Sequence, residues 1–591
     1  MGLALGIKMS KLIHVGDIYK VKGMQRRLHR IFTRRWHHTS NIPERPRVVT
    51  HSPKKEPKCM RIFKINRALS LIKKSQVAIF FIVTCAHVPA QLNAQSAAPA
   101  MLPLLGDGSE ISSGAERRLG DRIARELYRD PDFIEDPVLA DYVQGIWLPL
   151  LAAARARGDL TPELDERFAW RIVLGRDRSV NAFALPGGYL GVHLGLIAVV
   201  SSRSELASVL GHELSHVTQR HIARLMAKSN QQTPWMIGAM ILGALAASKN
   251  VDAGNALIVG GQALATQNQL NFSRDMEREA DRVGFGVMTQ AGFEALGFVT
   301  MFDKLQQASR LNDSGAYPYL RSHPLTTERI ADMQSRLPLG TKNPGSVTPT
   351  MPHAMLTARA RVLSNPGVDA LSAWQTQADD AALVKQPEAV QAGVLYGAAL
   401  AASHLRNAKL ARRQLDRLLN LVVPNAEAAL QARWLSVELA LAARELRQPQ
   451  LLALGEDLGM TRPEGFSQRR PELLLQAQIA LQTGHVESLD VVAQRLQTWV
   501  AMTPNDALAW QFLASIYIAQ NKTLRALRAE AEAKVAHLDY AGALDRLKGA
   551  QDRLRAPGGS NISSADHIDA SIIDTRLRQI EALLREQALE G

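Results

Sequence analysis

Cysteine is almost absent from this chain of 591 residues, which contains only Cys59 and Cys85. Both lie within the first 85 residues, so the rest of the chain has no thiol and can form no disulfide bond. The absence excludes a disulfide-stapled scaffold for the remainder. A chain without thiols is also compatible with an oxidising compartment.

Long apolar runs are also missing. The run at 77–84 is much shorter than the roughly 20 residues of a membrane-spanning helix. It follows a basic stretch and precedes small residues around 94–100, an arrangement typical of a secretory signal peptide. We therefore expect a signal peptide at 60–97 and export to a periplasm. Residues 1–59 are then an over-long gene start before Met60 or, alternatively, a basic disordered tail.

Acidic side chains are scarce at the amino-terminal end. Residues 1–74 carry 19 basic and 3 acidic side chains, a net of +16, against +14 for the whole chain. The basic character therefore belongs to this leader, and the remainder is slightly acidic. With the leader removed, no electrostatic reason to bind nucleic acid remains, and we expect no nucleic-acid partner.

The most informative motif is Gly-His-Glu-Leu-Ser-His-Val at 211–217. The preceding residues are helix-forming, and on a helix His212 and His216 share one face and can bind one ion. Glu213 stands beside them, where its carboxylate can accept a proton from a metal-bound water. Zinc with three protein ligands leaves a fourth position for that water. The motif predicts peptide-bond hydrolysis with one zinc ion (Zn2+) per chain.

A second helical stretch at 273–284 carries three carboxylates. Glu277 and Asp281 are four residues apart and share a face, whereas Glu279 points elsewhere. One carboxylate can bind the zinc while the other accepts the free N–H of a ligating histidine. By pattern alone, a solvated charged helix face is the alternative interpretation.

The motif His-Glu-x-x-His followed by Glu-x-Glu-Ala-Asp resembles the M48 peptidases. The resemblance implies that His212, His216 and Glu277 are the metal ligands. It also implies that Glu213 is the general base and that Asp281 supports a ligand by a hydrogen bond.

Residues 181–188 are similar to the family's segment before the active-site helix, and they read as strand, turn, strand. An exposed edge strand there can pair with an extended substrate backbone. An ordinary hairpin in a small sheet is compatible with this role. The expected substrate-binding residues are Asn181, Ala182, Phe183 and Ala184.

Residues 321–330 match the family's His-Pro element, which by resemblance lies over the zinc. His323 is then a further metal ligand or a contact to the transition state, and Arg329 stabilises the developing oxyanion. As a fourth ligand, His323 would instead displace the water and hold the enzyme latent.

The chain divides into regions of different pattern, and we expect a mostly α fold. Residues 105–339 predict a helical zincin-type metalloprotease domain with a small β-sheet near 170–195. A Pro/Gly/Thr-rich linker follows at 340–353. Residues 354–590 predict an α-solenoid of tetratricopeptide-like repeats.

The repeat prediction depends on alternating large and small residues. The clearest copy begins at Pro504 and continues through Trp510, Tyr517 and Ala526. Further copies are suggested by 539–544, 396–411, 434–441 and 477–484. A plain helical bundle is the alternative, but stacked repeats would form a concave surface that can hold another protein.

Together, an export signal, a protease domain and helical repeats resemble exported bacterial M48 peptidases. The resemblance implies a periplasmic endopeptidase, with chaperone-like activity, that handles misfolded or stalled outer-membrane proteins. It implies the barrel-assembly machinery and the lipopolysaccharide-assembly translocon as partners. The alternative is a mainly non-proteolytic assembly factor that acts through its repeats.

Two apolar Gly/Ala-rich segments, 235–247 and 256–265, lie between the two site motifs. Each has about half the length that a bilayer requires. We interpret them as packed helices; a hairpin on a membrane surface, which would make the protein peripheral to a membrane, is the alternative. An integral-membrane protease is disfavoured because no mature segment is expected to reach spanning length.

Overall fold

The computed structural model describes residues 111–228, 273–310, 317–341, 349–460, 469–555 and 564–589. The predicted signal peptide, both cysteines and the two apolar segments before Ser273 lie outside the described residues. Within the described part, helix α3 (Pro137–Arg157) is long and apolar enough to cross a membrane, contrary to our expectation. More than half of its apolar window is buried, as in a core helix of a globular domain.

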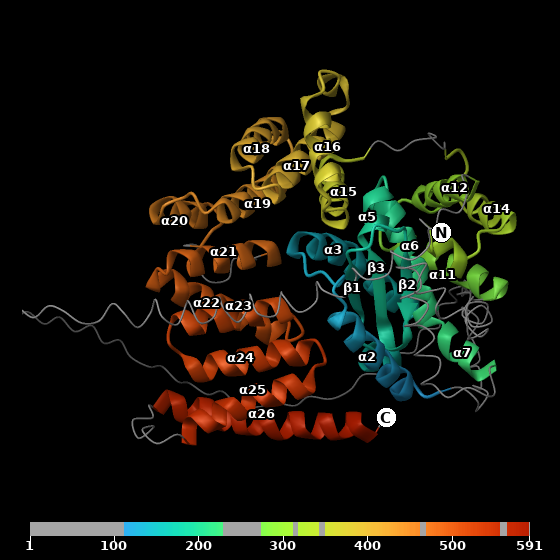
Figure 1. The fold of residues 1–591 in the computed structure, drawn as a ribbon. Coiled ribbons are helices and arrows are strands. Elements are labelled where there is room, and N and C mark those ends of the chain that lie inside the picture. The colour runs from blue at the N-terminus through green and yellow to red at the C-terminus, as the bar shows by residue number, and fades with distance from the viewer. Residues whose placement is uncertain are drawn as a thin grey trace, which may run out of the picture. The chain divides into compact units, whose positions relative to one another are not determined.

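The amino-terminal half surrounds a small sheet with helices (Figure 1). Its helices are α2 (Ser113–Arg129), α3, α4 (Pro162–Arg167), α5 (Leu194–Val199), α6 (Arg203–Thr218), α7 (His221–Lys228), α11 (Arg274–Gln290), α12 (Leu296–Arg310), α13 (Tyr319–Ser322) and α14 (Thr327–Ser335). Its strands are β1 (Arg171–Gly175), β2 (Ala182–Leu185) and β3 (Tyr189–His193), and the 3-10 helix η1 (Pro186–Gly188) joins β2 to β3.

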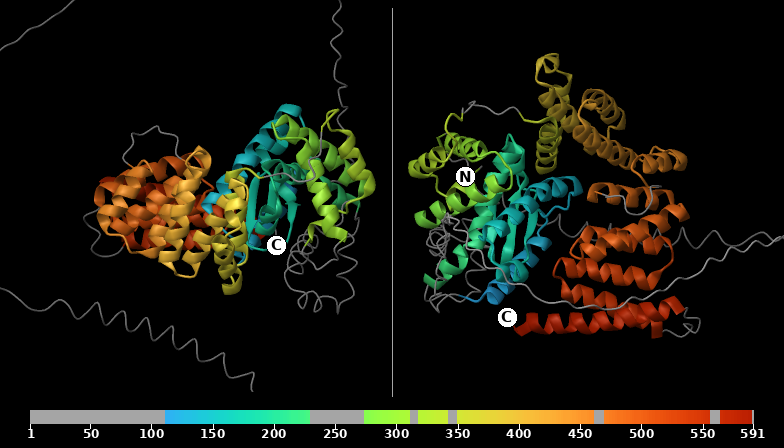
Figure 2. Two further views of the ribbon diagram at one scale, coloured as in Figure 1. Left: turned by 90° about the horizontal axis from the view of Figure 1, so that it is seen from above. Right: turned by 180° about the vertical axis from the view of Figure 1, so that it is seen from behind.

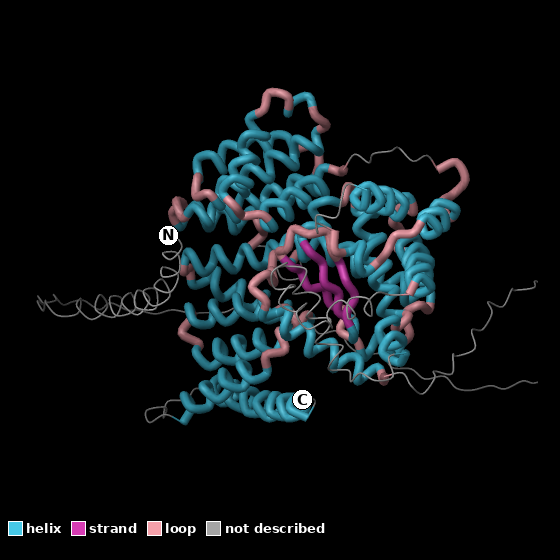
Figure 3. Tube along the Cα trace, turned by 45° about the vertical axis from the view of Figure 1, so that its right-hand side comes forward, coloured by secondary structure: helices cyan, strands magenta, loops and turns pink. Residues whose placement is uncertain are grey.

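The three strands form one sheet in the order β1-β3-β2 (Figure 3). Strand β3 pairs in parallel with β1 and antiparallel with β2, so β2 is an edge of the described sheet. The turn between β2 and β3 contains Gly187 and Gly188, whose φ angles of 70° and 84° favour glycine. The small sheet expected near 170–195 is therefore confirmed.

In its described residues, the carboxyl-terminal half consists of helices joined by turns and loops, without a strand. Its α-helices are α15 (Met351–Ser364), α16 (Val368–Asp379), α17 (Glu388–His404), α18 (Ala408–Val422), α19 (Ala426–Ala443), α20 (Gln448–Asp457), α21 (Arg470–Thr483), α22 (Val486–Met502), α23 (Ala507–Ala519), α24 (Thr523–Ala536), α25 (Tyr540–Arg555) and α26 (Ser564–Leu589). The 3-10 helix η2 (Leu383–Lys385) lies between α16 and α17.

Most consecutive helices of this half pack against one another, as the series from yellow to red in Figures 1 and 2 shows. Small residues allow close packing; a Cβ on Gly397, for example, would collide with the ring of Trp374. The expected fold class is confirmed: mostly α, with a small sheet, and with a carboxyl-terminal helical region that fits a repeat solenoid.

The boundary between the two halves differs slightly from the prediction. Helix α15 begins at Met351 after its N-cap Thr350, whose hydroxyl accepts a hydrogen bond from the backbone N–H of His353. The last three residues of the predicted linker, 351–353, are therefore helical. Helix α15 also packs against α5 and α3, so it contacts the amino-terminal half directly.

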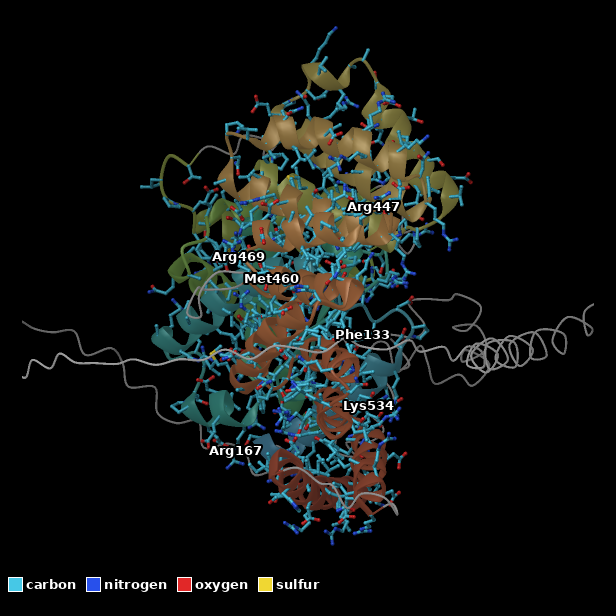
Figure 4. The ribbon with its side chains drawn as sticks, turned by 90° about the vertical axis from the view of Figure 1, so that its left-hand side faces the viewer. Phe133, Arg167, Arg447, Met460, Arg469 and Lys534 are labelled. Atoms are coloured by element: carbon cyan, nitrogen blue, oxygen red, sulfur yellow. The ribbon has the colours of Figure 1, made fainter. Side chains whose placement is uncertain are left out.

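A second contact between the halves lies near the end of α24. His537 stacks on Tyr128, and its ring meets that of Phe133 edge to face. Figure 4 labels Phe133 and, from α24, Lys534 on this side of the molecule. Arg171 of β1 donates a hydrogen bond to the carbonyl of Ala536. These contacts connect the α24–α25 turn to β1 and to the end of α2.

Candidate metal centre

Two helices supply most of the site, and both begin at side-chain caps. Ser202 caps α6 by accepting from the N–H of Glu205, and Ser273 caps α11 by accepting from the N–H of Met276. The helices approach closely where Gly211 of α6 meets Gly284 of α11. A Cβ on Gly284 would lie 2.9 Å from the carbonyl oxygen of Gly211, so this approach requires glycine.

The crossing brings three of the predicted ligands together. The Nε2 atoms of His212 and His216 are 3.0 Å apart, and each lies 3.5 Å from an oxygen of Glu277. With His323, these residues offer ligand atoms that all lie within 4.8 Å of one another. All four side chains are buried. A buried convergence of imidazole and carboxylate groups fits a bound cation. The four residues His212, His216, Glu277 and His323 form a candidate metal-binding group, which we call the centre.

Asp281, the expected hydrogen-bond partner of a ligand, lies behind His212. Its Oδ1 is 2.9 Å from Nδ1 of His212, the ring nitrogen that faces away from His216. Burial opposes the charged form of His212, but hydrogen bonds to Asp281 and Glu277 raise its pKa to about 9. Burial and the charge of His212 hold the pKa of His216 well below its usual value. The carboxylates of Asp281 and Glu277 therefore favour a positive charge at His212.

Arg329, which we expect to stabilise the oxyanion, pairs with two carboxylates of the site. Its Nε and Nη2 donate to the two oxygens of Asp281 at 2.6 and 2.8 Å, and Nη1 donates to the carbonyl of Pro324. Nη1 also lies 2.8 Å from Oε2 of Glu277. Because these carboxylates occupy the guanidinium, the structure favours Arg329 as a positioning residue for Glu277 and Asp281.

His323 reaches the centre from the loop after α13. Its Nδ1 lies 3.0 Å from Oε1 of Glu277 and 3.4 Å from Nε2 of His212. Its ring stacks on Tyr319, with the centroids 4.6 Å apart. This position is compatible with a fourth metal ligand.

Glu213 is fully buried beside the cluster. Its Oε2 accepts a hydrogen bond from the backbone N–H of Ala184 at 2.9 Å. Its Oε1 makes no hydrogen bond to any described residue and lies 3.4 Å from Nε2 of His323. Burial raises the pKa of Glu213, which moves the carboxyl toward a value suited to proton exchange.

The predicted substrate-binding residues lie on and beside the edge strand. Ala182, Phe183 and Ala184 belong to β2, whereas Asn181 precedes it and accepts a hydrogen bond from the N–H of His193. Backbone groups alternate in direction along an antiparallel strand, so those of Ala182 and Ala184 point away from β3. The hydrogen bond from Ala184 to Glu213 shows that this outer edge faces the centre.

Sequence reasoning missed His221 and did not assign a role to Glu279. The structure places His221 beside His216, with their Nδ1 atoms 2.9 Å apart, and Glu279 beside His221. The signal was present, because a third histidine follows His216 by five residues. The helix break that turns it back toward His216 was not predicted.

Comparisons with known proteins agree with this geometry. Residues 156–337 match the family model described as "Peptidase family M48". The beta-barrel assembly-enhancing protease of Escherichia coli is 32% identical over 324 residues, and a Vibrio cholerae protein of the same designation is 34% identical over 325 residues. The mitochondrial metalloendopeptidase OMA1 of Arabidopsis thaliana is 29% identical over 196 residues.

The extent of these similarities is limited. The two bacterial alignments cover 54% of this chain and 62% and 63% of the relatives' own lengths. The alignment with the Arabidopsis protein covers 33% of this chain and 36% of that protein. The matched family segment includes both site motifs and the His-Pro element. Residues 156–337 of this chain therefore form a peptidase family M48 domain.

Proposed function

We propose that this chain is a periplasmic zinc-dependent endopeptidase with chaperone-like activity in the quality control and assembly of outer-membrane β-barrel proteins. The observation that carries the proposal is the buried convergence of His212, His216 and Glu277 next to Glu213. The names of the bacterial relatives support the substrate class.

The donor set fits zinc. Two imidazoles and one carboxylate are a common ligand set for catalytic zinc, and the centre contains no thiolate, which softer metals would prefer. When bound, zinc would lower the pKa of a coordinated water and polarise the scissile carbonyl. His212, His216 and Glu277 would hold it, one ion per chain.

Glu213 is placed to accept the proton of the attacking water. The N–H of Ala184 fixes one carboxylate oxygen and leaves the other turned toward the centre. Because burial raises its pKa, Glu213 can take a proton and then pass it to the leaving amine. The same hydrogen bond ties the position of the base to the substrate-binding strand.

The outer edge of β2 is suited to an extended polypeptide. The backbone groups of Ala182 and the carbonyl of Ala184 face away from β3, and a substrate strand can pair with them as an additional strand, while the N–H of Ala184 stays bonded to Glu213. Unfolded barrel proteins expose such segments, because their native strands are not yet paired.

His323 supports a latent resting state, since it lies within reach of Glu277, His212 and Glu213 together. We expect His323→Ala to raise the rate of casein digestion by the purified chain, because the fourth ligand position would be open to water. The digestion rate under matched metal loading tests this; a slower His323→Ala enzyme would contradict the latch and favour a contact to the transition state.

The second candidate is a mainly non-proteolytic assembly factor. The burial of all four candidate ligands favours a centre that rests closed. In this case the carboxyl-terminal solenoid, as tetratricopeptide-like repeats, holds the clients. Replacing the native gene with Glu213→Gln tests the two candidates: normal levels of assembled barrel proteins favour the second, and defective assembly with undegraded clients favours the first.

Partners and location belong to the same proposal. The repeats would dock on the barrel-assembly machinery and on the lipopolysaccharide-assembly translocon, and the signal peptide at 60–97 would direct export. Contact of 235–247 and 256–265 with a membrane surface would make the protein peripheral. Fractionation with a periplasmic marker, followed by a salt or carbonate wash, distinguishes these locations.

A further inference from the structure

The outer nitrogen of His216 faces a second histidine instead of a carboxylate. Helix α6 ends at Thr218, and Arg220 adopts a left-handed backbone with φ 52° before α7 begins at His221. Arg220 is fixed there by a hydrogen bond from its Nε to Glu116 of α2. This turn directs His221 back toward α6, so that its Nδ1 lies 2.9 Å from Nδ1 of His216.

The contact continues to a carboxylate on the other ligand-bearing helix. Nε2 of His221 lies 3.1 Å from Oε2 of Glu279, and Arg224 donates from Nη1 to the same oxygen at 2.8 Å. His216 and His221 are fully buried, whereas Glu279 and Arg224 are about one third exposed. The chain of contacts therefore runs from the centre to the surface.

Metal binding determines where the protons lie in the series of contacts from His216 through His221 to Glu279. His216 presents Nε2 to the centre, so in its neutral, ligating form the proton is on Nδ1. That N–H donates to Nδ1 of His221, which must accept. The proton of His221 is then on Nε2 and donates to Glu279. Among the described contacts, this arrangement of protons satisfies His216, His221 and Glu279 together.

We propose that His221 and Glu279 are positioning residues that orient His216 for metal binding, an inference that rests on the proposed metal centre. Asp281 supports His212 directly at 2.9 Å, and Glu279 supports His216 through the intervening ring of His221. Helix α11 thus contributes one ligand, Glu277, and one anionic support for each histidine. Such outer partners fix the tautomer and the orientation of a ligand, and their loss typically weakens metal binding about 10- to 100-fold.

The test measures zinc affinity of the purified chain by competition with a chromophoric chelator. We expect His221→Phe, which keeps a ring but removes both hydrogen bonds, to weaken binding about 10- to 100-fold. His221→Gln retains an acceptor and a donor and should recover part of this loss. Glu279→Gln, at a partly exposed position that tolerates change, should weaken binding in the same direction but less.

His353→Phe is the matched control. His353 is also a buried histidine with two hydrogen bonds, to Tyr142 and to the carbonyl of Val200, but it lies outside the centre. It should lower thermal stability without changing zinc affinity. The absorption spectrum of the cobalt-substituted protein provides a second readout, which should change in His221→Phe and not in His353→Phe.

Equal zinc affinity in wild type and His221→Phe would overturn the inference, as would an equal loss in His353→Phe. If Glu279→Gln and His221→Phe leave the cobalt spectrum unchanged, the pair does not orient His216. A wild-type chain that binds no zinc would overturn the proposed metal centre itself, and the inference with it.

Discussion

At the residue scale, the centre depends on hydrogen bonds behind the ligands. Asp281 bridges His212 and Arg329, and Arg329 also contacts Glu277. Arg329 therefore fixes the position of Glu277, a candidate ligand, relative to Asp281, which contacts the candidate ligand His212. The buried charges compensate one another, as burial of ionised groups requires.

Asp281→Asn should weaken metal binding about 10- to 100-fold and lower kcat/KM similarly, because the amide cannot neutralise Arg329 while accepting from His212. Zinc affinity and peptide cleavage measure the two effects. Asp332→Asn is the control, since Asp332 pairs with Arg336 on the partly exposed face of α14. A wild-type zinc affinity in Asp281→Asn would contradict the support of His212.

A second residue-scale prediction concerns pH. Asp506 caps α23 and binds Arg470 through both oxygens at 2.7 and 2.8 Å. Burial opposes its charged form, but the bonds to Arg470 hold its pKa below the usual value. The resulting stability is complete above the ordinary aspartate pKa of about 4 and is lost as the pH falls through the folded pKa.

Asp506→Asn retains a good N-cap but removes the charge, so it should lower the free energy of unfolding by about 3 kcal/mol at pH 7. The difference from wild type should shrink steadily below pH of about 4, because the wild-type carboxylate becomes protonated. Urea unfolding of wild type and Asp506→Asn, at pH 7 and again below pH of about 4, measures this difference. A difference that does not depend on pH would exclude the charge as its source.

At the element scale, the approach of α6 to α11 sets the distance between Glu277 and the two histidines. Gly284→Ala should separate the helices, because its Cβ would lie 2.9 Å from backbone atoms of Gly211 and His212. We expect a loss of about 1–3 kcal/mol in stability together with weaker zinc binding. Chemical unfolding and chelator competition measure the two effects.

Gly549→Ala is the matched control for this substitution. Gly549 lies in α25, and apart from the nearby backbone of its own helix, no atom of the described residues lies within 4 Å of the position that its Cβ would take. Because alanine favours a helix, Gly549→Ala should raise stability by about 0.5–1 kcal/mol. If Gly284→Ala behaved like Gly549→Ala, the helix crossing would not need glycine.

The sequence predicted elements more completely than the contacts between them. Helical spacing placed His212 and His216 on one face, and the strand-turn-strand interpretation of 181–188 placed a strand at Ala182. It did not predict that α7 turns back at Arg220, because a left-handed arginine has no local signal and is held by Glu116 from α2. Roles that depend on such distant contacts, as for His221 and Arg329, required the structure.

At the scale of the whole molecule, a buried arginine joins the two halves. Arg359 of α15 donates to Asp136, the N-cap of α3, and to Glu438 of α19. It also donates to the hydroxyl of Tyr396 in α17. No composition or periodicity could predict this junction, because its members are up to 302 residues apart in the sequence.

Arg359→Met should lower the free energy of unfolding by about 3–5 kcal/mol, because the buried carboxylate of Asp136 would lose its cation, as would the one-third-exposed carboxylate of Glu438. Urea unfolding followed by tryptophan fluorescence measures this. Arg412→Met is the control, since Arg412 forms an exposed pair with Asp416 within α18 and should change stability by less than about 1 kcal/mol. Equal effects of the two substitutions would contradict the junction.

The central claim concerns one metal ion held by His212, His216 and Glu277 with Glu213 as the base. The most direct measurement compares wild type and Glu213→Gln for bound zinc and for casein cleavage, with and without a chelator. We predict one zinc per chain in both proteins, cleavage by wild type that the chelator abolishes, and a loss of about 100- to 10,000-fold in Glu213→Gln. Cleavage that persists in Glu213→Gln, or in wild type stripped of metal, would contradict the account.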